Sequence, residues 1–435
     1  MRRSHTSPGG PKRSSLARLG RLARLFGPGL VTGAADDDPS GILTYSQSGA
    51  QFGTGQLWTA VVMLPFLIAV QEMSARIALV TNQGIATTLR KHYSKPVLYV
   101  IVLLLLAANT INLGADLGAM ADSAHLLLPV PNAIYVLVFA TTAIVLEVFI
   151  SYRRYAPLLK VLALSLFAYV LTGLIATHDW GTVIRASFLP HIQFDYQFLM
   201  IFVGVFGTTI SPYCFFWQAS EELEERRAGN LGRGGLQALL STMQRDTSIG
   251  MFASEIATWF IIETTAVVLY AHGIRDISTS AQAAQALEPL VASFHYAGVV
   301  SKVLFASGVI GTGALAIPIF AATSSYALCE LLEWKEGLDL KPRQAPGFYW
   351  IMLGGTAVGV LENYVRVNPI KMLIYTAVIN GIVAVPVILM LILIANNKRI
   401  MGDRASGVWS NIGSLATLLV MTLSGGLMMY TFWRK

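Results

Sequence analysis

Residues 27–41 read GPGLVTGAADDDPSG, and apolar sequence resumes directly afterwards at Ile42. Each ionised carboxylate at mid-bilayer costs at least ~2.5–3.5 kcal/mol on insertion scales, so three in a row need water, a cation or protonation. Pro39 removes a backbone donor and clashes with the preceding turn. We therefore expect a membrane helix that unwinds at this point. The alternative, acids solvated at the membrane surface, is disfavoured because residues 30–35 are too short to have crossed the bilayer.

The composition of the whole chain indicates a membrane protein. Hydrophobic residues make up 54% and charged residues 13% of the 435 residues, and the mean hydropathy is +0.59. An ordinary soluble core cannot hide so much apolar surface, so the lipid bilayer is the expected surroundings. The two cysteines both lie in apolar stretches, which leaves no disulfide framework and no Cys/His metal cluster.

About eleven apolar stretches approach the roughly 20 residues that a spanning helix needs. They lie near residues 28–50, 56–80, 97–124, 132–150, 158–176, 196–220, 248–271, 296–330, 348–364, 371–395 and 407–431. Residues 1–26 form a basic tail without the features of a signal peptide. If this tail is cytosolic, most of the 31 Lys and Arg residues fall on the cytosolic side and the C-terminus is extracytosolic. The net charge of +7 is then a consequence of topology in an inner or plasma membrane, and nucleic-acid binding is not expected.

A second interruption lies in the sixth apolar stretch, where residues 204–213 read GVFGTTISPY. Gly/Pro-interrupted segments at matching places in two halves of a chain point to an inverted-repeat transporter with its site near the midplane. We therefore expect an all-α membrane protein with broken helices 1 and 6 in a LeuT-like five-plus-five arrangement. The predicted transporter domain covers 27–435, with repeats at about 27–176 and 196–395 and an extra helix at 407–431.

These two stretches resemble the Nramp family of divalent-metal transporters, whose hallmarks are Asp-Pro-Gly-Asn in span 1 and Met-Pro-His in span 6. Further similar segments are Gly27-Pro28-Gly29, Ser74-Ala75-Arg76, Val80-Thr81, Ala115-Asp116-Leu117 and Asn397-Lys398-Arg399-Ile400-Met401-Gly402. The resemblance covers most of the chain. It implies a secondary transporter whose substrate is a divalent metal cation.

The resemblance also implies the residues of the metal site. Asp38 matches the metal-binding aspartate of the family, and Thr208 falls where a span 6 backbone carbonyl reaches the ion. Gly41 stands in place of the ligating asparagine, and Ser211 stands in place of the methionine. The full set of candidate metal residues is Asp38, Ser211, Thr208, Asp37, Ser40, Gly41 and Asn380.

These departures from the family pattern indicate a hard cation. A thioether favours late transition metals, whereas carboxylate, hydroxyl, carbonyl and water suit Mg²⁺, Ca²⁺ and Mn²⁺. Ser211 therefore hardens the site, and Gly41 enlarges it for an ion such as Mg²⁺ that often keeps several waters. The pattern resembles the Nramp-related magnesium transporters, so we expect Mg²⁺ and Mn²⁺. Tyr213, Gln218 and Ala119 replace two histidines and a glutamate of the family, so we expect weak proton coupling or none.

Other intramembrane polar residues are candidates for the conduction path, because ionisable groups inside a membrane are functional hypotheses by default. The pathway or gating candidates are Asp116, Tyr213 and Glu263. Glu72 and Glu147 lie close to arginines near the cytosolic ends of their spans, and we expect them to serve in structural pairing or gating.

Two other kinds of transporter remain as alternatives. One is a proton-coupled Mn²⁺/Fe²⁺ importer that tolerates Ser211, and the other is a cation-coupled symporter of an organic solute. An enzyme is not expected, because no paired catalytic carboxylates, Ser/His arrangement or phosphate loop appears in the sequence. We expect neither a cofactor nor an obligate protein partner.

Overall fold

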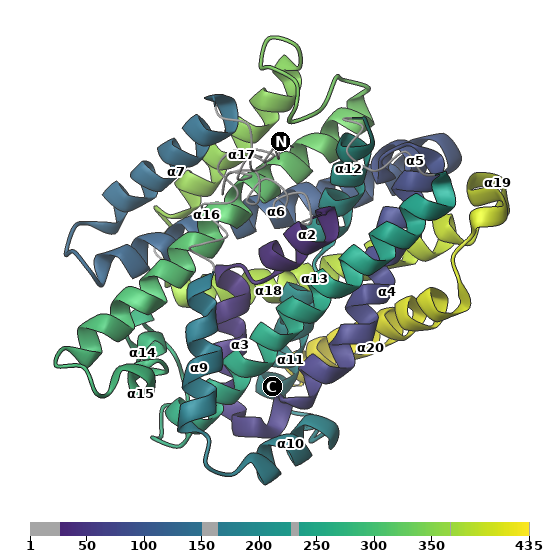
Figure 1. The fold of residues 1–435 in the computed structure, drawn as a ribbon. Helices are drawn as coiled ribbons and strands as arrows, with labels where there is room; N and C mark the ends of the chain where they lie inside the picture. The colour runs from purple at the N-terminus through teal and green to yellow at the C-terminus, as the bar shows by residue number, and fades with distance from the viewer. Residues whose placement is uncertain (1–26, 150–163, 228–234, 366, 435) are drawn as a thin grey trace, which may run out of the picture.

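The computed structural model describes residues 27–149, 164–227, 235–365 and 367–434. Within these ranges the chain is helical and forms no β-strand (Figure 1). The basic tail predicted at 1–26 and the beginning of the span predicted at 158–176 lie outside the described residues.

The predicted spans correspond to helices of the structure. In the part of the chain that the structure describes, eight helical segments are long and apolar enough to cross a membrane. They are α4 (Trp58–Thr81), α6 (Lys95–His125), α7 (Asn132–Phe149), α11 with α12 (Tyr196–Arg227), α13 with the π-turn η3 (Leu236–Tyr270), α16 (Ala297–Leu332), α18 (Pro369–Ala395) and α20 (Val408–Trp433). The other predicted spans are the shorter helices α2 (Pro28–Asp36) with α3 (Pro39–Phe52), α9 (Phe167–Ala176) and α17 (Pro346–Glu362).

Short helices occupy several of the connections between these spans. They are α5 (Ile85–His92), α10 (Trp180–Phe188), α14 (Ser280–Gln285), α15 (Glu288–Val291) and α19 (Lys398–Met401). The helices on either side of the hydrophilic stretch after the sixth span also extend beyond their apolar sequence, since α12 ends at Arg227 and α13 begins at Leu236.

The first span breaks at the three consecutive acids, as predicted. Helix α2 ends at Asp36, Asp37 leaves helical geometry with φ −85° and ψ 56°, and Asp38 is extended with φ −71° and ψ 173°. Asp38 is the N-cap of α3, and Pro39 follows as its first residue. Aspartate is a preferred N-cap, and proline fits the first helical position because no donor is needed there. The residues that end α2 therefore also begin α3.

The second break separates α11 (Tyr196–Thr209) from α12 (Pro212–Arg227). Ile210 leaves helical geometry with φ −100° and ψ 65°. The hydroxyl of Ser211 lies 2.8 Å from the carbonyl oxygen of Gly207 and 2.6 Å from that of Thr208. A side-chain donor thus serves the last carbonyls of α11, which lack partners within their own helix.

The two broken helices lie at the centre of the bundle (Figure 1). Helix α3 packs against α11 and α2 packs against α12, while α13 contacts both α2 and α3. The most apolar window of the α11–α12 segment is 94% buried inside the protein, whereas those of α7 and α20 are only 22% and 33% buried. The breaks are therefore enclosed by protein, and α7 and α20 form the periphery.

Candidate functional site

Hydrogen bonds join the two broken helices at their breaks. Asp38 Oδ1 accepts from the backbone N–H of Gly41 at 2.8 Å and from the Ser40 hydroxyl at 2.6 Å. The Ser40 hydroxyl also lies 2.9 Å from the Thr208 hydroxyl of α11. Asp38 is only 1% exposed, and Ser40 and Thr208 are fully buried. The structure thus brings together four of the predicted metal residues, Asp38, Ser40, Gly41 and Thr208, the last of them from the second broken helix.

Tyr213, the second residue of α12, covers another side of Asp38. Its hydroxyl donates to the carbonyl oxygen of Ala35 at 3.1 Å and lies 3.4 Å from Asp38 Oδ2. Its ring packs edge-on against Phe320 of α16, with ring centroids 4.4 Å apart. Because Oδ1 of Asp38 already accepts two short hydrogen bonds, Oδ2 is the carboxylate oxygen better placed to meet a cation.

Gly41 is closely surrounded at the two breaks. A Cβ atom at this position would lie 3.1 Å from Tyr45 Cε2, 3.4 Å from the Thr208 hydroxyl and 3.5 Å from the carbonyl oxygen of Asp36. A longer side chain at position 41 would therefore press against α11 and the end of α2. Glycine allows the two breaks to approach each other this closely.

The amide of Asn380, a predicted ligand on α18, is engaged by another amide. Its Oδ1 accepts from Asn112 Nδ2 of α6 at 2.8 Å, and its Nδ2 donates to Asn112 Oδ1 at 3.2 Å. Interhelical amide pairs of this kind stabilise membrane bundles. A role of Asn380 as a metal ligand stays a prediction, and it requires Asn112 to release the amide.

The two acidic pathway candidates have different surroundings. Asp116 of α6 is fully buried, neither of its carboxylate oxygens has a hydrogen-bond partner among the described residues, and the charge that acts on it is Asp38. Glu263 of α13 accepts hydrogen bonds from Thr177 and, at 3.3 Å, from Thr264. Asp116 is therefore a free acid near the breaks, whereas Glu263 is held in a contact between α13 and the residue that follows α9.

Asp36 and Asp37 contact α13, a helix to which the sequence assigned only Glu263. Asp36 Oδ2 accepts from the Ser254 hydroxyl at 3.1 Å, and Asp37 lies beside Thr258. Glu255 interacts electrostatically with both aspartates. We predicted Asp37 as a metal ligand but gave no role to Asp36 or to these α13 residues. The sequence feature that could have indicated these residues is the placing of three polar side chains, at positions 254, 255 and 258, within about one helical turn of an apolar span.

The described part of the chain contains no group of three or more His, Cys, Asp or Glu side chains arranged to hold a metal ion. A cation at the breaks would therefore need neutral oxygens in addition to Asp38. Hydroxyl and carbonyl oxygens of Ser40, Thr208 and Ser211 lie at these breaks. Mg²⁺ commonly uses one or two carboxylates together with waters, so this donor set fits such an ion.

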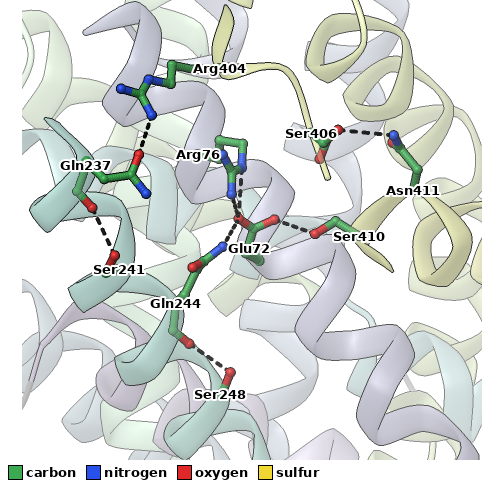
Figure 2. Close-up of polar contacts among 10 residues, drawn as sticks. All are labelled: Glu72, Arg76, Gln237, Ser241, Gln244, Ser248, Arg404, Ser406, Ser410 and Asn411. Atoms are coloured by element: carbon green, nitrogen blue, oxygen red, sulfur yellow. Dashed lines mark hydrogen bonds and ion pairs between the residues drawn. The ribbon is translucent and has the colours of Figure 1, made fainter. Parts of the chain in front are cut away.

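Glu72 forms the expected pair with Arg76 in a network that joins three helices (Figure 2). The shortest Glu72–Arg76 contact is 2.5 Å, Gln244 of α13 donates to Glu72 Oε1 at 3.1 Å, and Ser410 of α20 donates to Oε2 at 2.7 Å. This arrangement supports structural pairing.

Glu147 has one oxygen without a partner among the described residues, and the arginines expected near it, at 153 and 154, lie outside them.

Comparison with known sequences gives a match over nearly the whole chain. The model of the Nramp family, described as natural resistance-associated macrophage protein-like, matches residues 29–431. The divalent metal cation transporter MntH of Klebsiella pneumoniae subsp. pneumoniae is 24% identical over 423 residues, which are 95% of each chain. The protein of the same name from Mesorhizobium japonicum is 26% identical over 303 residues, covering 67% of this chain and 64% of its own length.

Solved structures share the fold. A manganese transporter of Eremococcus coleocola superposes with a TM-score of 0.74 at 15% identity, covering 96% of this chain and 87% of its own. Mhp1, a nucleobase-cation-symport-1 family transporter in a closed conformation, gives a TM-score of 0.58 at 13% identity over 94% of this chain and 93% of its own. These similarities confirm the all-α, LeuT-like class predicted from the two breaks. Because the family model spans residues 29–431, the chain belongs to the Nramp family.

Proposed function

We propose that the chain is a secondary transporter of divalent metal cations that favours Mg²⁺ and Mn²⁺. The observation that carries this proposal is the position of Asp38, a buried carboxylate between two broken helices, with hydroxyl oxygens of Ser40, Thr208 and Tyr213 around it. The printed names of the relatives, divalent metal cation transporter and manganese transporter, support the class of cation.

In the proposed site, Asp38 Oδ2 and the Thr208 carbonyl oxygen are the principal ligands. Ser211 lies 2.6 Å from that carbonyl, so a cation that approaches the carbonyl also meets the serine hydroxyl. Ser40 and the Gly41 N–H hold Asp38 Oδ1 and thereby orient the carboxylate. The donors are all oxygen atoms, which supports a hard cation over a soft one.

Weak proton coupling, or none, is the second part of the proposal. Tyr213 uses its hydroxyl as a donor to Ala35, and Gln218 donates to the Thr247 hydroxyl at 2.6 Å in the contact between α12 and α13. Neither side chain titrates near neutral pH. Asp116 is the buried acid that could still carry a proton, so the test must measure proton movement directly.

The packing of the broken helices supports two repeats of opposite orientation. Helix α2, the first half of span 1, packs against α12, the second half of span 6, and α3 packs against α11. Two broken helices that run antiparallel make this pairing, and inverted repeats place them so. We accordingly propose repeats over about 27–176 and 196–395 in an inner or plasma membrane, with the N-terminus cytosolic and the C-terminus extracytosolic.

Uptake into liposomes that contain the purified protein and an internal pH dye tests the proposal. We expect Mg²⁺ and Mn²⁺ to enter faster than into protein-free liposomes, with nearly constant internal pH. Acidification in proportion to Mn²⁺ uptake would instead identify the proton-coupled Mn²⁺/Fe²⁺ importer. Absence of any protein-dependent flux of divalent cations would contradict the proposal and leave the organic-solute symporter as the alternative.

A further inference from the structure

Helices α2 and α13 run side by side in parallel, and their register is fixed by close backbone contacts. Asp246 accepts from the N–H groups of Gly27 and Gly29 at 3.2 and 2.6 Å, so the carboxylate caps the start of α2. Further along, a Cβ atom at Gly33 would clash with the backbone of Gly250. Continuing this register by one turn brings Asp36 to Ser254, where the hydrogen bond of 3.1 Å is found.

This register places a second group of acids against α13, on the side where α2 ends. Asp36 and Asp37 lie at the C-terminal end of α2, and Glu255 of α13 interacts with the charges of both. A helix C-terminus carries partial negative charge, so it disfavours carboxylates and favours cations. Asp38 has the opposite situation, since it caps the N-terminus of α3. A bound cation would therefore stabilise Asp36 and Asp37, at the end of α2, more than it would stabilise Asp38, at the start of α3.

Several polar atoms in this second group have no partner among the described residues. Glu255 is 4% exposed, and neither of its carboxylate oxygens accepts a hydrogen bond. Oδ1 of Asp37 is also without a partner, and the hydroxyl of Thr258 is fully buried beside the Asp37 carboxylate. Burying such groups without compensation is costly. The two unpartnered oxygens of Glu255 therefore point to a ligand, and Thr258 adds a neutral oxygen beside the acids.

No basic side chain is among the charged groups that act on these acids in the described structure. The charges that act on Asp36, Asp37 and Glu255 are those of one another and of Asp38. The ion pairs Glu72–Arg76 and Arg90–Glu333 involve other residues. Among the described residues, these acids therefore have no basic side chain as a counter-ion.

We propose that Glu255, Asp37 and Thr258 form a second site for a hard divalent cation, next to the Asp38 site and on the α13 side of the break. Asp36, held by Ser254 and lying 3.7 Å from the Cys214 sulfur through its other oxygen, adds charge without binding the ion directly. Two carboxylates, one hydroxyl and waters are a sufficient ligand set for Mg²⁺ or Mn²⁺. The site does not require three converging acids, in agreement with their absence from the described residues.

Counting bound Mn²⁺ on the purified full-length protein tests this inference. We expect calorimetry and electron paramagnetic resonance to give two Mn²⁺ per chain for the unmodified protein and one for Glu255→Gln. Asp38→Asn should also retain one, and the double variant should retain none. Thr258→Val should weaken one of the two binding steps about tenfold or more, while Thr258→Ser keeps it.

A matched control is Glu147→Gln, because Glu147 is another buried acid with an oxygen that lacks a partner among the described residues. This variant should still bind two Mn²⁺. A single Mn²⁺ on the unmodified protein, lost in Asp38→Asn and unaffected by Glu255→Gln, would overturn the second site and leave the proposed function standing. Loss of the same Mn²⁺ in Glu147→Gln would also overturn it, because the effect at Glu255 would then reflect general damage to buried acids.

Discussion

The hydroxyl of Ser211 lies 2.6 Å from the carbonyl oxygen of Thr208. Ser211, which we predict to stand in place of the family's methionine, therefore donates to the carbonyl oxygen that we propose as a metal ligand. A cation can bind there if the hydroxyl hydrogen turns away, because the serine oxygen then becomes a second neutral ligand. A methionine at this position could neither donate to the carbonyl nor offer an oxygen.

Replacing Ser211 by methionine is expected to exchange preference between hard and soft cations. The thioether supplies a soft ligand for Cd²⁺ and adds bulk beside the proposed ligands, where a hydrated Mg²⁺ would bind. We expect Ser211→Met to bind Cd²⁺ at least about tenfold more tightly and to transport Mg²⁺ more slowly, since selectivity is a difference of affinities. Calorimetry with Cd²⁺ and flux with Mg²⁺ measure the two effects.

Ser211→Ala is the control for this experiment, because it removes the hydroxyl without adding sulfur. It should lower Mg²⁺ transport without improving Cd²⁺ binding. If the unmodified protein already prefers Cd²⁺ strongly, or if Ser211→Met changes neither ion, then Ser211 does not set selectivity.

Replacing Asp38 by asparagine is expected to abolish uptake of Mg²⁺ and Mn²⁺. The substitution removes the charge of the proposed principal ligand. Asparagine is also a good N-cap, so its side-chain oxygen can still accept from the Gly41 N–H and α3 should begin as before. Uptake should fall to the level of protein-free liposomes while the unfolding temperature changes little. Transport at the unmodified rate by a folded Asp38→Asn protein would remove Asp38 from the site.

The two breaks could be predicted from the sequence because their causes are local. Asp38 and Pro39 are adjacent, and an N-cap acid followed by proline both ends one helix and begins the next. The hydrogen bonds of Ser211 to the carbonyls three and four residues earlier are also local, and they follow a known habit of serine in helices. These two hydrogen bonds of Ser211 could therefore have been predicted from the sequence alone.

Contacts between distant parts of the chain could not be predicted in this way. Asn112 and Asn380 pair across 268 residues, and nothing near Asn380 in the sequence indicates that its amide is engaged. The approach of Asp36 to Ser254 depends on the register of α2 along α13, which a close contact between two glycines sets. Such registers arise from packing between helices. The sequence therefore shows which acids lie in membrane spans, but it does not show which of them lie close together.

Enlarging Gly33 is expected to destabilise the protein through the contact between α2 and α13. A Cβ atom there would clash with the Gly250 backbone, which cannot move aside as a flexible side chain would. We expect Gly33→Ala to lower the free energy of unfolding by about 1–3 kcal/mol, as overpacking does in cores. Thermal unfolding in detergent measures this change. Gly355→Ala is the matched control, since a Cβ at that position of α17 would meet no atom within 4 Å apart from the backbone of its own helix and its chain neighbours. Equal effects of both substitutions would show that α2 is not tightly packed on α13.

Metal uptake is expected to proceed without stoichiometric proton entry. We predict that Tyr213 and Gln218 stand where the family has histidines, and both are engaged in hydrogen bonds that do not depend on pH near neutrality. Mn²⁺ uptake should therefore leave the internal pH dye nearly unchanged while the Mn²⁺ signal rises.

Asp116→Asn tests whether Asp116, the remaining buried acid that could carry a proton, contributes to transport. Asp116 is buried, its two carboxylate oxygens have no partner among the described residues, and the charge of Asp38 acts on it. If transport is uncoupled, as we expect, Asp116→Asn changes the rate of Mn²⁺ uptake without changing the ratio of protons to metal, which stays near zero. Acidification that tracks the Mn²⁺ dose in the unmodified protein, and that disappears in Asp116→Asn, would show that a carboxylate on α6 replaces the histidines of span 6 as the proton carrier.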